Sequence, residues 1–363
     1  MKKLLCFSII SILCLSGCGA PTNNKQKPKT PEEYLSEMTL EEKVAQMFIV
    51  HCPELGTSEE VEKYSFGGML FFASHFKNET PESITEKISH WQEKAKTPMF
   101  IAVDEEGGIV TRVSRYTAFR TKPFPSPQKL YAGGGMEKVA ADTDEKSKLL
   151  LSLGVNLNFA PVCDVATSPD AFIYPRTLGQ DAVTTAEYVK TVVSGMNANN
   201  IGSALKHFPG YGDNEDTHIG YAIDTRPYES FAKSDFLPFK AGIDEGAGMV
   251  MVSHNIVKCM DKNMPASLSP AVHEELRSLG FEGIIITDDL TMDAIKEFTA
   301  DSTAAVMAIK AGNDMLCCSN YEEQIQAVVD AVKNGEIPQS RIDESVRRIL
   351  KYKEELGIIK HEN

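Results

Sequence analysis

Two short stretches of the sequence carry side chains suited to proton transfer or nucleophilic attack. The first, KHFPGYGDNEDTHIG at residues 206–220, places Asp216 and His218 on one glycine-containing loop. Because the two residues are two positions apart, they share a face in an extended segment, and the carboxylate can polarise the imidazole. A histidine held in this way can donate and recover a proton near neutral pH. For so short a pattern, a chance surface pair is the alternative interpretation.

The second stretch, IIITDDLTM at residues 284–292, puts Asp288 and Asp289 directly after an apolar run. A carboxylate at this position can act as a base, a nucleophile or a metal ligand. Neighbouring residues on a strand face opposite ways, so we expect only one of the two to face a site. The other aspartate is then free to cap a following helix.

Other chemistries have weaker support in the sequence. It contains no His-x-His at a strand end, no His-Glu-x-x-His and no cluster of cysteine and histidine, so metal-assisted hydrolysis is a minority hypothesis. It also contains no Gly-x-Ser-x-Gly elbow and no phosphate-binding glycine loop followed by Lys-Ser or Lys-Thr. We therefore expect neither a metal ion nor a cofactor.

These residues must be positioned by the elements around them, and the sequence predicts eight buried strands. Each is a short, continuous apolar run, as expected of parallel strands that are covered on both faces. The eight runs lie at residues 46–51, 67–73, 99–105, 155–161, 202–208, 248–254, 283–289 and 313–318. Amphipathic segments predict helices between and after them, at residues 39–47, 80–95, 185–196, 269–280, 302–312, 321–335 and 340–357.

This alternation predicts an α/β fold with one (β/α)8 barrel, and a doubly wound open sheet is the alternative. Polar residues stand at the carboxyl ends of five predicted strands. They are Asp104 and Glu105, Asp164, Lys206 and His207, Ser253 and His254, and Asp288 and Asp289. In a barrel these ends converge on one mouth, which is where barrel enzymes have their active sites. The recurrence of polar residues at one relative position favours a catalytic site over a set of solvated strand ends.

Composition and charge narrow the class of partner. The chain has 363 residues, of which 42% are hydrophobic, and its net charge is -14 at pH 7. An acidic surface repels phosphate, so nucleic acid is a poor candidate as a partner.

The amino terminus has two lysines, a short apolar run and small residues before Cys18. This pattern is typical of a secretory signal, and its ending resembles that of a bacterial lipoprotein, in which Cys18 carries the lipid. An ordinary cleaved signal is the alternative. We expect a signal peptide at residues 1–17, a flexible tether at 18–32 and one domain at 33–363. The domain would be anchored to the outer face of the cytoplasmic membrane.

Eight motifs in order give the chain a family likeness. They are VDEEGGIVTRV, NFAPVCDV, YPRTLG, ALKHFPGYGDNEDTH, MVSH, PASLSP, GIIITDDLTM and AGNDML. Together they resemble the single-domain β-N-acetylhexosaminidase branch of glycoside hydrolase family 3, from about residue 33 onward. The resemblance implies a (β/α)8 barrel that removes terminal β-linked N-acetylglucosamine with retention of configuration, for example in the turnover of cell wall or chitin fragments.

The resemblance also implies roles for individual residues. Asp288 corresponds to the nucleophile of the family, and the pair Asp216 and His218 corresponds to the acid–base group of this branch. The sugar-binding positions of the family fall on Asp104, Arg112, Arg176, Lys206 and His207. The expected partner is an N-acetylglucosamine-containing glycan or muropeptide.

The sequence departs from the family pattern in a few places. Tyr211 stands where the family usually has histidine, the loop before the dyad is one residue short, and DEEGG replaces DQEGG. His75 has no counterpart in the pattern. Two other functions remain open, namely a β-glucosidase or other exo-β-glycosidase of the same family, and a non-catalytic sugar-binding lipoprotein. The physiological substrate, the strictness for N-acetyl sugars and the oligomeric state are not encoded in any motif.

Overall fold

The computed structural model describes residues 29–53, 57–212, 222–296, 298–299 and 303–360. Eight parallel strands form a closed barrel in the order β1-β10-β9-β7-β5-β4-β3-β2, which confirms the predicted (β/α)8 fold. The strands are β1 (Phe48–His51), β2 (Gly68–Phe71), β3 (Phe100–Val103), β4 (Leu157–Asn158), β5 (Gly202–Phe208), β7 (Met249–Val252), β9 (Ile284–Asp289) and β10 (Met315–Cys318). Each predicted apolar run contains one of these strands.

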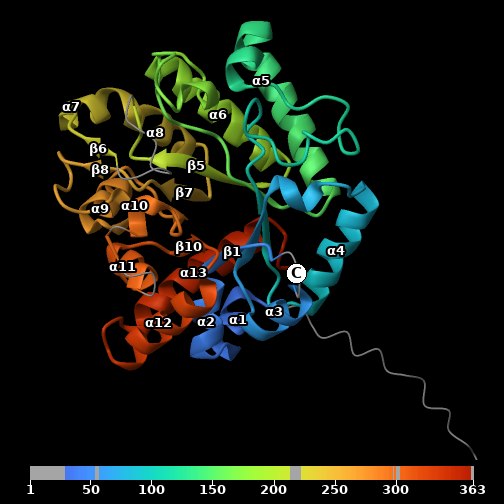
Figure 1. The fold of residues 1–363 in the computed structure, drawn as a ribbon, viewed down its shortest axis with the longest axis vertical. Coiled ribbons are helices and arrows are strands. Elements are labelled where there is room, and N and C mark those ends of the chain that lie inside the picture. Colours follow the sequence, from blue (N-terminus) through green and yellow to red (C-terminus); the bar gives the residue numbers. More distant parts are fainter. Residues whose placement is uncertain (1–28, 54–56, 213–221, 297, 300–302, 361–363) are drawn as a thin grey trace, which may run out of the picture.

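Helices surround the barrel, and the elements at the two ends of the chain lie side by side (Figure 1). The larger helices are α2 (Leu40–Gln46), α3 (Thr57–Tyr64), α4 (Pro81–Lys94), α5 (Pro127–Ser152), α6 (Ala182–Ala198), α8 (Phe236–Asp244), α9 (Pro270–Ser278), α11 (Ala304–Ala311), α12 (Tyr321–Lys333) and α13 (Gln339–Glu355). Helix α1 (Pro31–Glu37) packs against α13, and β1 pairs with β10. The first and last strands thus close the sheet on itself, which removes its open edges.

Local signals place several helix ends as the sequence predicts. Thr39 caps α2 and forms a capping box with Glu42. Ser269 caps α9, whose first residue is Pro270. The long helix α5 was not among the predicted elements. Glycines 134 and 135 interrupt its helical backbone and weaken the periodic pattern of apolar residues that would predict a helix.

Smaller elements decorate the carboxyl ends of the strands. Strands β6 (Ile223–Asp224) and β8 (Ile256–Val257) form a separate two-stranded parallel sheet. Short helical turns include η1 (Ala73–Phe76), η2 (Tyr174–Arg176), η4 (Phe231–Asp235) and η5 (Ala266–Leu268), together with α7 (Tyr228–Ser230) and α10 (Asp293–Lys296). One of them, η2, supplies Arg176 to the mouth of the barrel.

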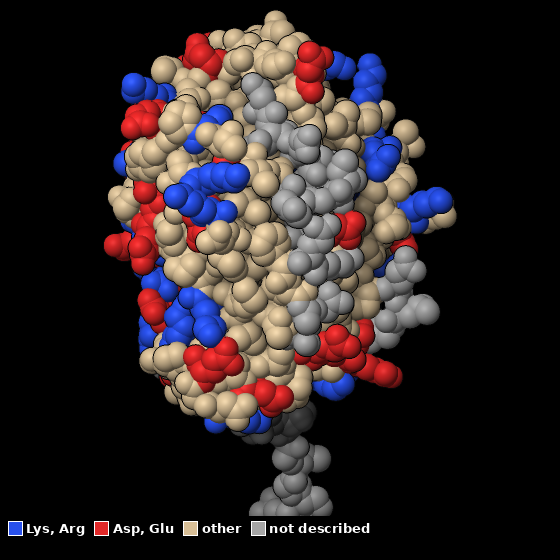
Figure 2. Space-filling view, turned by 60° about the vertical axis from the view of Figure 1, so that its left-hand side comes forward, with Lys and Arg blue, Asp and Glu red and all other residues tan. Residues whose placement is uncertain are grey.

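The barrel strands are buried on both faces, as the apolar runs predict. Charged side chains of both signs are scattered around the face shown in Figure 2, without one large patch of a single sign. Within the described ranges, no helix combines the length and the apolar character that crossing a bilayer requires. The predicted signal peptide lies outside these ranges. Helix α1 begins at Pro31, two residues before the predicted boundary between tether and domain at residue 33. That boundary stays a prediction.

Candidate active site

The carboxyl ends of the barrel strands surround a cavity of about 360 Å³. This volume is in the range of sites that hold one small molecule. Its lining includes every predicted catalytic or sugar-binding residue that the structure describes: Asp104, Arg112, Arg176, Lys206, His207 and Asp288. The predicted acid–base pair, Asp216 and His218, lies outside the described residues, and so does Cys18.

Both aspartates at the end of β9 line the cavity, so the expectation that only one would face the mouth is wrong. The pairing of β9 with β10 is irregular here, because Met315 lies opposite Ile286 but Cys317 lies opposite Asp289. One extra residue on β9 breaks the strict alternation of its side chains. Asp289 does not cap a helix either. Its Oδ1 accepts hydrogen bonds from the backbone N–H and the hydroxyl of Thr291, two residues later.

A chain of charges crosses the cavity from β3 to β5. Lys206 Nζ lies 2.7 Å from Asp104 Oδ1 and 2.6 Å from Glu106 Oε1. Arg176 donates from Nη2 and Nε to the two oxygens of Glu106, at 2.7 and 3.0 Å. Arg112 lies 3.5 Å from the other oxygen of Asp104. The two carboxylates are therefore held between three cations.

The sequence placed Glu105 at the mouth, but Glu106 occupies the cavity instead. Glu105 is fully buried, and its carboxylate accepts hydrogen bonds from the backbone N–H groups of Arg112 and Val113, each at 2.7 Å. It thus fixes the loop after β3 from inside. The two-residue spacing between Asp104 and Glu106, which puts their side chains on one face of extended chain, is the signal that could have found Glu106.

The surrounding cations keep these carboxylates ionised. Burial alone would raise the pKa of Asp104, but Lys206 and Arg112 together bring it below its usual value. Burial acts in the same direction on Glu106, and Arg176 and Lys206 more than offset it, so the pKa of Glu106 is also lowered. Neither group holds a proton near neutral pH. Both are acceptors for the hydroxyl groups of a ligand, and neither is suited to donate a proton.

His207 is held in one orientation by groups on both sides of its ring. Its Nδ1 lies 2.8 Å from Asp164 Oδ2, and its Nε2 lies 3.1 Å from Arg176 Nη2. Because an arginine can only donate, Nε2 accepts and Nδ1 carries the proton that is donated to Asp164. Asp164 lies in the segment that follows β4, and it is buried. It also accepts a hydrogen bond from the backbone N–H of Tyr211.

The described part of the 206–220 loop is clamped at its glycines. Gly210 and Gly212 have φ angles of 117° and 56°, as their residue type predicts. A Cβ atom on Gly210 would lie 2.4 Å from Asp235 Oδ1, and one on Gly212 would lie 2.6 Å from Arg226 Cζ. Arg226 donates to the carbonyl oxygen of Gly210 at 3.1 Å and pairs with Asp224 and Asp235. Burial raises the pKa of Asp235 to about 7, against the opposing effect of Arg226.

Tyr211, which replaces the histidine usual in the family, packs inside the protein. Its side chain is buried, and its ring lies edge-on to His207 at 5.3 Å and to Phe172 at 5.0 Å. The aromatic ring therefore supports the cavity wall through His207.

Two further histidines hold strand ends in place. The backbone N–H of Phe72 donates to His75 Nδ1 at 2.9 Å, so Nε2 carries the ring proton and donates to the carbonyl oxygen of Cys52. His75 thereby ties the end of β1 to the end of β2. His254 Nε2 lies 2.9 Å from the backbone oxygen of Asp289, and its Nδ1 lies 2.7 Å from the Ser267 hydroxyl.

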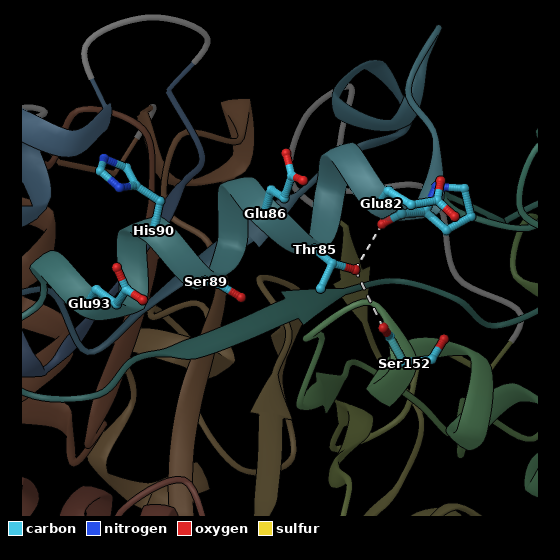
Figure 3. Close-up of a pocket in the computed structure, with 8 residues that line it drawn as sticks. Glu82, Thr85, Glu86, Ser89, His90, Glu93 and Ser152 are labelled. Atoms are coloured by element: carbon cyan, nitrogen blue, oxygen red, sulfur yellow. Dashed lines mark hydrogen bonds between the residues drawn. The ribbon is translucent and has the colours of Figure 1, made fainter.

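The described residues that line a larger groove on the outside of the barrel do not form a network of ion pairs like that of the mouth cavity. It runs along α4 and has a volume of about 620 Å³. Glu86 and His90 lie on one side of the helix and Ser89 and Glu93 on the other, and Thr85 donates to backbone oxygens of Pro81 and Ser152 (Figure 3). In the part of the chain that the structure describes, no group of three or more His, Cys, Asp and Glu residues is arranged to hold a metal ion.

Comparisons with known proteins point to one family of glycoside hydrolases. The model of the glycosyl hydrolase family 3 N terminal domain matches residues 39–352. "Beta-hexosaminidase A" of Pseudoalteromonas piscicida is 30% identical over 340 residues, which cover 84% of this chain and 55% of that protein. "Beta-hexosaminidase" of Xanthomonas campestris pv. campestris is 33% identical, over 74% of this chain and 82% of the relative.

A solved structure is similar over most of the chain. It is a glycoside hydrolase family 3 β-N-acetylglucosaminidase from Paenibacillus sp., with a TM-score of 0.82 and 29% identity. The match covers 90% of this chain and 64% of that structure. The chain thus spans between about half and two thirds of the length of two of these relatives and most of the length of the third.

Proposed function

Because this chain belongs to glycosyl hydrolase family 3, we propose that it is an exo-β-N-acetylhexosaminidase that removes terminal β-linked N-acetylglucosamine. The relatives named above are called β-hexosaminidases and a β-N-acetylglucosaminidase. One observation carries the proposal. A cavity of about 360 Å³ holds the family aspartate Asp288 together with the charged set of Asp104, Lys206, Glu106 and Arg176.

The proposed reaction has two displacements at the anomeric carbon. Asp288 attacks that carbon and forms a covalent glycosyl-enzyme, while an acid protonates the departing oxygen. Water then attacks the intermediate with the help of the same group acting as a base, so the configuration is retained. The backbone N–H of Asp289 donates to Asp288 Oδ1 at 2.8 Å, which supports a fixed orientation for the attacking carboxylate.

We assign the acid–base role to His218, tuned by Asp216, on the resemblance alone. The surroundings of the residues that line the cavity support a proton donor that comes from another part of the chain. Asp104 and Glu106 have lowered pKa values, and His207 Nε2 accepts from Arg176, so none of the three offers a proton to a leaving group. Asp104, Arg112, Arg176, Lys206 and His207 would instead bind sugar hydroxyl groups.

A panel of nitrophenyl β-glycosides tests the proposed activity. We expect turnover of the N-acetylglucosaminide to exceed that of the glucoside, galactoside and xyloside. Turnover confined to the other sugars would refute the proposed specificity. A sugar-binding lipoprotein without catalytic function would bind N-acetylglucosamine in calorimetry and turn over none of the panel.

A β-glucosidase activity is the second candidate function. It is favoured by a relative from Cellulomonas fimi named "Beta-N-acetylglucosaminidase/beta-glucosidase", which is 28% identical over 340 residues. The same panel separates the two, since a dual enzyme would hydrolyse glucoside and N-acetylglucosaminide at comparable kcat/KM.

The physiological setting is also a proposal. A lipid on Cys18 would hold the enzyme at the outer face of the cytoplasmic membrane, where cell-wall and chitin fragments are within reach.

A further inference from the structure

A histidine at the end of β1 lines the mouth cavity but has no part in the reaction described so far. His51 lies level with Leu70 of β2, and its Nε2 is 2.8 Å from Asp289 Oδ2. Each of the two side chains keeps 22% of its surface exposed, so the contact sits at the cavity wall. The residues meet only because β1 closes the barrel against β10, which pairs in turn with β9.

The histidine ring is held in place by its neighbours. It lies edge-on to Phe72, with the ring centroids 4.7 Å apart and the planes at 73°. Phe72 is fixed in turn by the hydrogen bond from its backbone N–H to His75. The guanidinium of Arg112 lies 5.9 Å from the centroid of the Phe72 ring. His51 is therefore a packed part of the cavity wall, with its Nε2 directed at Asp289.

Asp289 connects His51 to the nucleophile candidate. Its Oδ2 contacts His51, and its Oδ1 accepts two hydrogen bonds from Thr291. Its backbone N–H donates to Asp288 Oδ1, and its backbone oxygen lies 2.9 Å from His254 Nε2. A change in the side-chain contacts of Asp289 would thus reach Asp288 through one shared peptide group.

Two adjacent carboxylates in one cavity repel each other when both are ionised. Burial would raise the pKa of Asp289, but the hydrogen bond and the charge of His51, together with Thr291, lower it. The ionisable side chains on the elements around His51 include Asp288 on β9, Cys317 and Cys318 on β10, His75 after β2, and Asp104, Glu106 and Arg112 after β3. Arg112 pairs with Asp104, whereas Asp289 contacts His51.

We propose that His51 is a positioning residue for the nucleophile. By pairing with Asp289 it holds and compensates the second carboxylate, which leaves Asp288 free to face the sugar. The inference rests on the proposed function, because it gives His51 a role in preparing Asp288 for attack.

Two variants separate charge from hydrogen bonding at this position. His51→Leu removes both, whereas His51→Gln can keep a neutral donor toward Asp289. The measurement is kcat/KM on nitrophenyl β-N-acetylglucosaminide from about pH 4 to pH 9, whose acid limb reports the essential base of the free enzyme. We expect His51→Leu to lose about ten- to a hundredfold at the optimum and to move the acid limb upward by about one pH unit. His51→Gln should lose less activity and show the same direction of shift.

His90→Leu serves as the matched control, because His90 lies on the exposed side of α4 and outside the cavity. It should keep the activity and the pH profile of the wild type. Thermal unfolding of each variant separates loss of fold from loss of function. If His51→Leu folds poorly, the pH profile of His51→Gln decides the role of His51. An acid limb that stays at the wild-type pH in a folded His51 variant would overturn the proposal, whatever the loss in rate.

Failure of the inference is distinct from failure of the proposed function. If the wild type hydrolyses the N-acetylglucosaminide and folded His51 variants match its pH profile, only the role of His51 is wrong. If the wild type turns over no glycoside of the panel, the proposed function is wrong and the role of His51 in it falls as well.

Discussion

At the scale of single residues, the two aspartates of β9 share a cavity but have different surroundings. Oδ1 of Asp289 accepts two hydrogen bonds from Thr291, and its Oδ2 lies 2.8 Å from His51 Nε2. Among the described residues, Asp288 receives one hydrogen bond, from the peptide N–H of its neighbour. A carboxylate that must attack a carbon needs an oxygen free of strong donors, and a carboxylate that only supports it does not. This difference favours Asp288 as the nucleophile.

We therefore expect the covalent intermediate to form on Asp288. A slow substrate with fluorine beside the anomeric carbon should accumulate as a glycosyl-enzyme, because its second displacement is retarded. Mass spectrometry of the digested protein should find the sugar on the peptide that contains Asp288. The Asp288→Asn variant is the control and should remain unlabelled. Label on Asp289, or none on an enzyme that hydrolyses the parent substrate, would contradict the assignment.

His218 should matter most when the leaving group is poor. An aryl group of low pKa departs without a proton, whereas a sugar alkoxide does not. Proton transfer contributes roughly a hundred- to ten-thousandfold in rate, so His218→Ala should lose about that much on a disaccharide and far less on the first step with a dinitrophenyl glycoside. Asp216→Ala should act in the same direction but less severely. Equal losses on both substrates in kcat/KM would instead indicate a structural clamp.

At the scale of elements, the two ends of the barrel are built differently. The mouth is formed by loops after the strands, and its charges are paired across β3, β5 and η2. The opposite end holds Lys353 of α13, whose Nζ donates to Gln46 Oε1 at 2.8 Å and lies over the Phe100 ring. This ammonium group is fully buried, and its burial lowers its pKa to about 7.

Lys353 should make folding stability depend on pH. In the unfolded chain its pKa is near 10.5, so between about pH 7 and pH 10.5 the unfolded state binds more protons than the folded state. Stability therefore rises with pH across this window, by up to about 1.4 kcal/mol per pH unit from this group. Urea unfolding at pH 7 and pH 9 should show a gain in the wild type that exceeds the gain in Lys353→Met by roughly 2 kcal/mol.

The comparison has a control on the same helix. Lys351 has 70% of its side chain exposed, and Lys351→Met should keep the pH dependence of the wild type. Parallel stability curves for the wild type and Lys353→Met would show that Lys353 stays protonated in the folded protein.

At the scale of the whole molecule, the shared direction of the strands sets which end of the barrel is the mouth. Helix α2 leads directly into the beginning of β1, and α1 is joined to α13 by the ion pair of Glu32 with Arg347. Helix α1 thus lies near the end of the barrel where the strands begin, opposite to the mouth.

We expect Cys18→Ala to release the protein from the membrane without changing its chemistry. The wild type should partition with membranes, and the variant should appear in the soluble extracytoplasmic fraction. kcat/KM on a soluble aryl glycoside should be the same for both, because the residues that line the cavity all belong to the barrel. Equal partition of the two proteins into membranes would show that attachment does not depend on Cys18.

The sequence by itself determined the architecture and the location of the site. Buried parallel strands are continuous apolar runs, and this property is local, so each of the eight strands was visible before any contact was known. Strand polarity then places Asp104, Lys206 and Asp288 at one mouth, because all carboxyl ends of a parallel barrel face the same way. The helix ends at Thr39 and Ser269 followed equally from short-range capping patterns.

Only the tertiary structure decided which neighbouring groups act together. The extra residue on β9 brought both Asp288 and Asp289 into the cavity. The turn after β3 placed Glu106 in the cavity and Glu105 against the backbone of the loop. The contact of His51 with Asp289 joins residues that are distant in the chain. It depends on the register and closure of the barrel, which arise from the packing of all strands at once. Local patterns predict which residues reach the mouth, whereas register and closure set the distances between them.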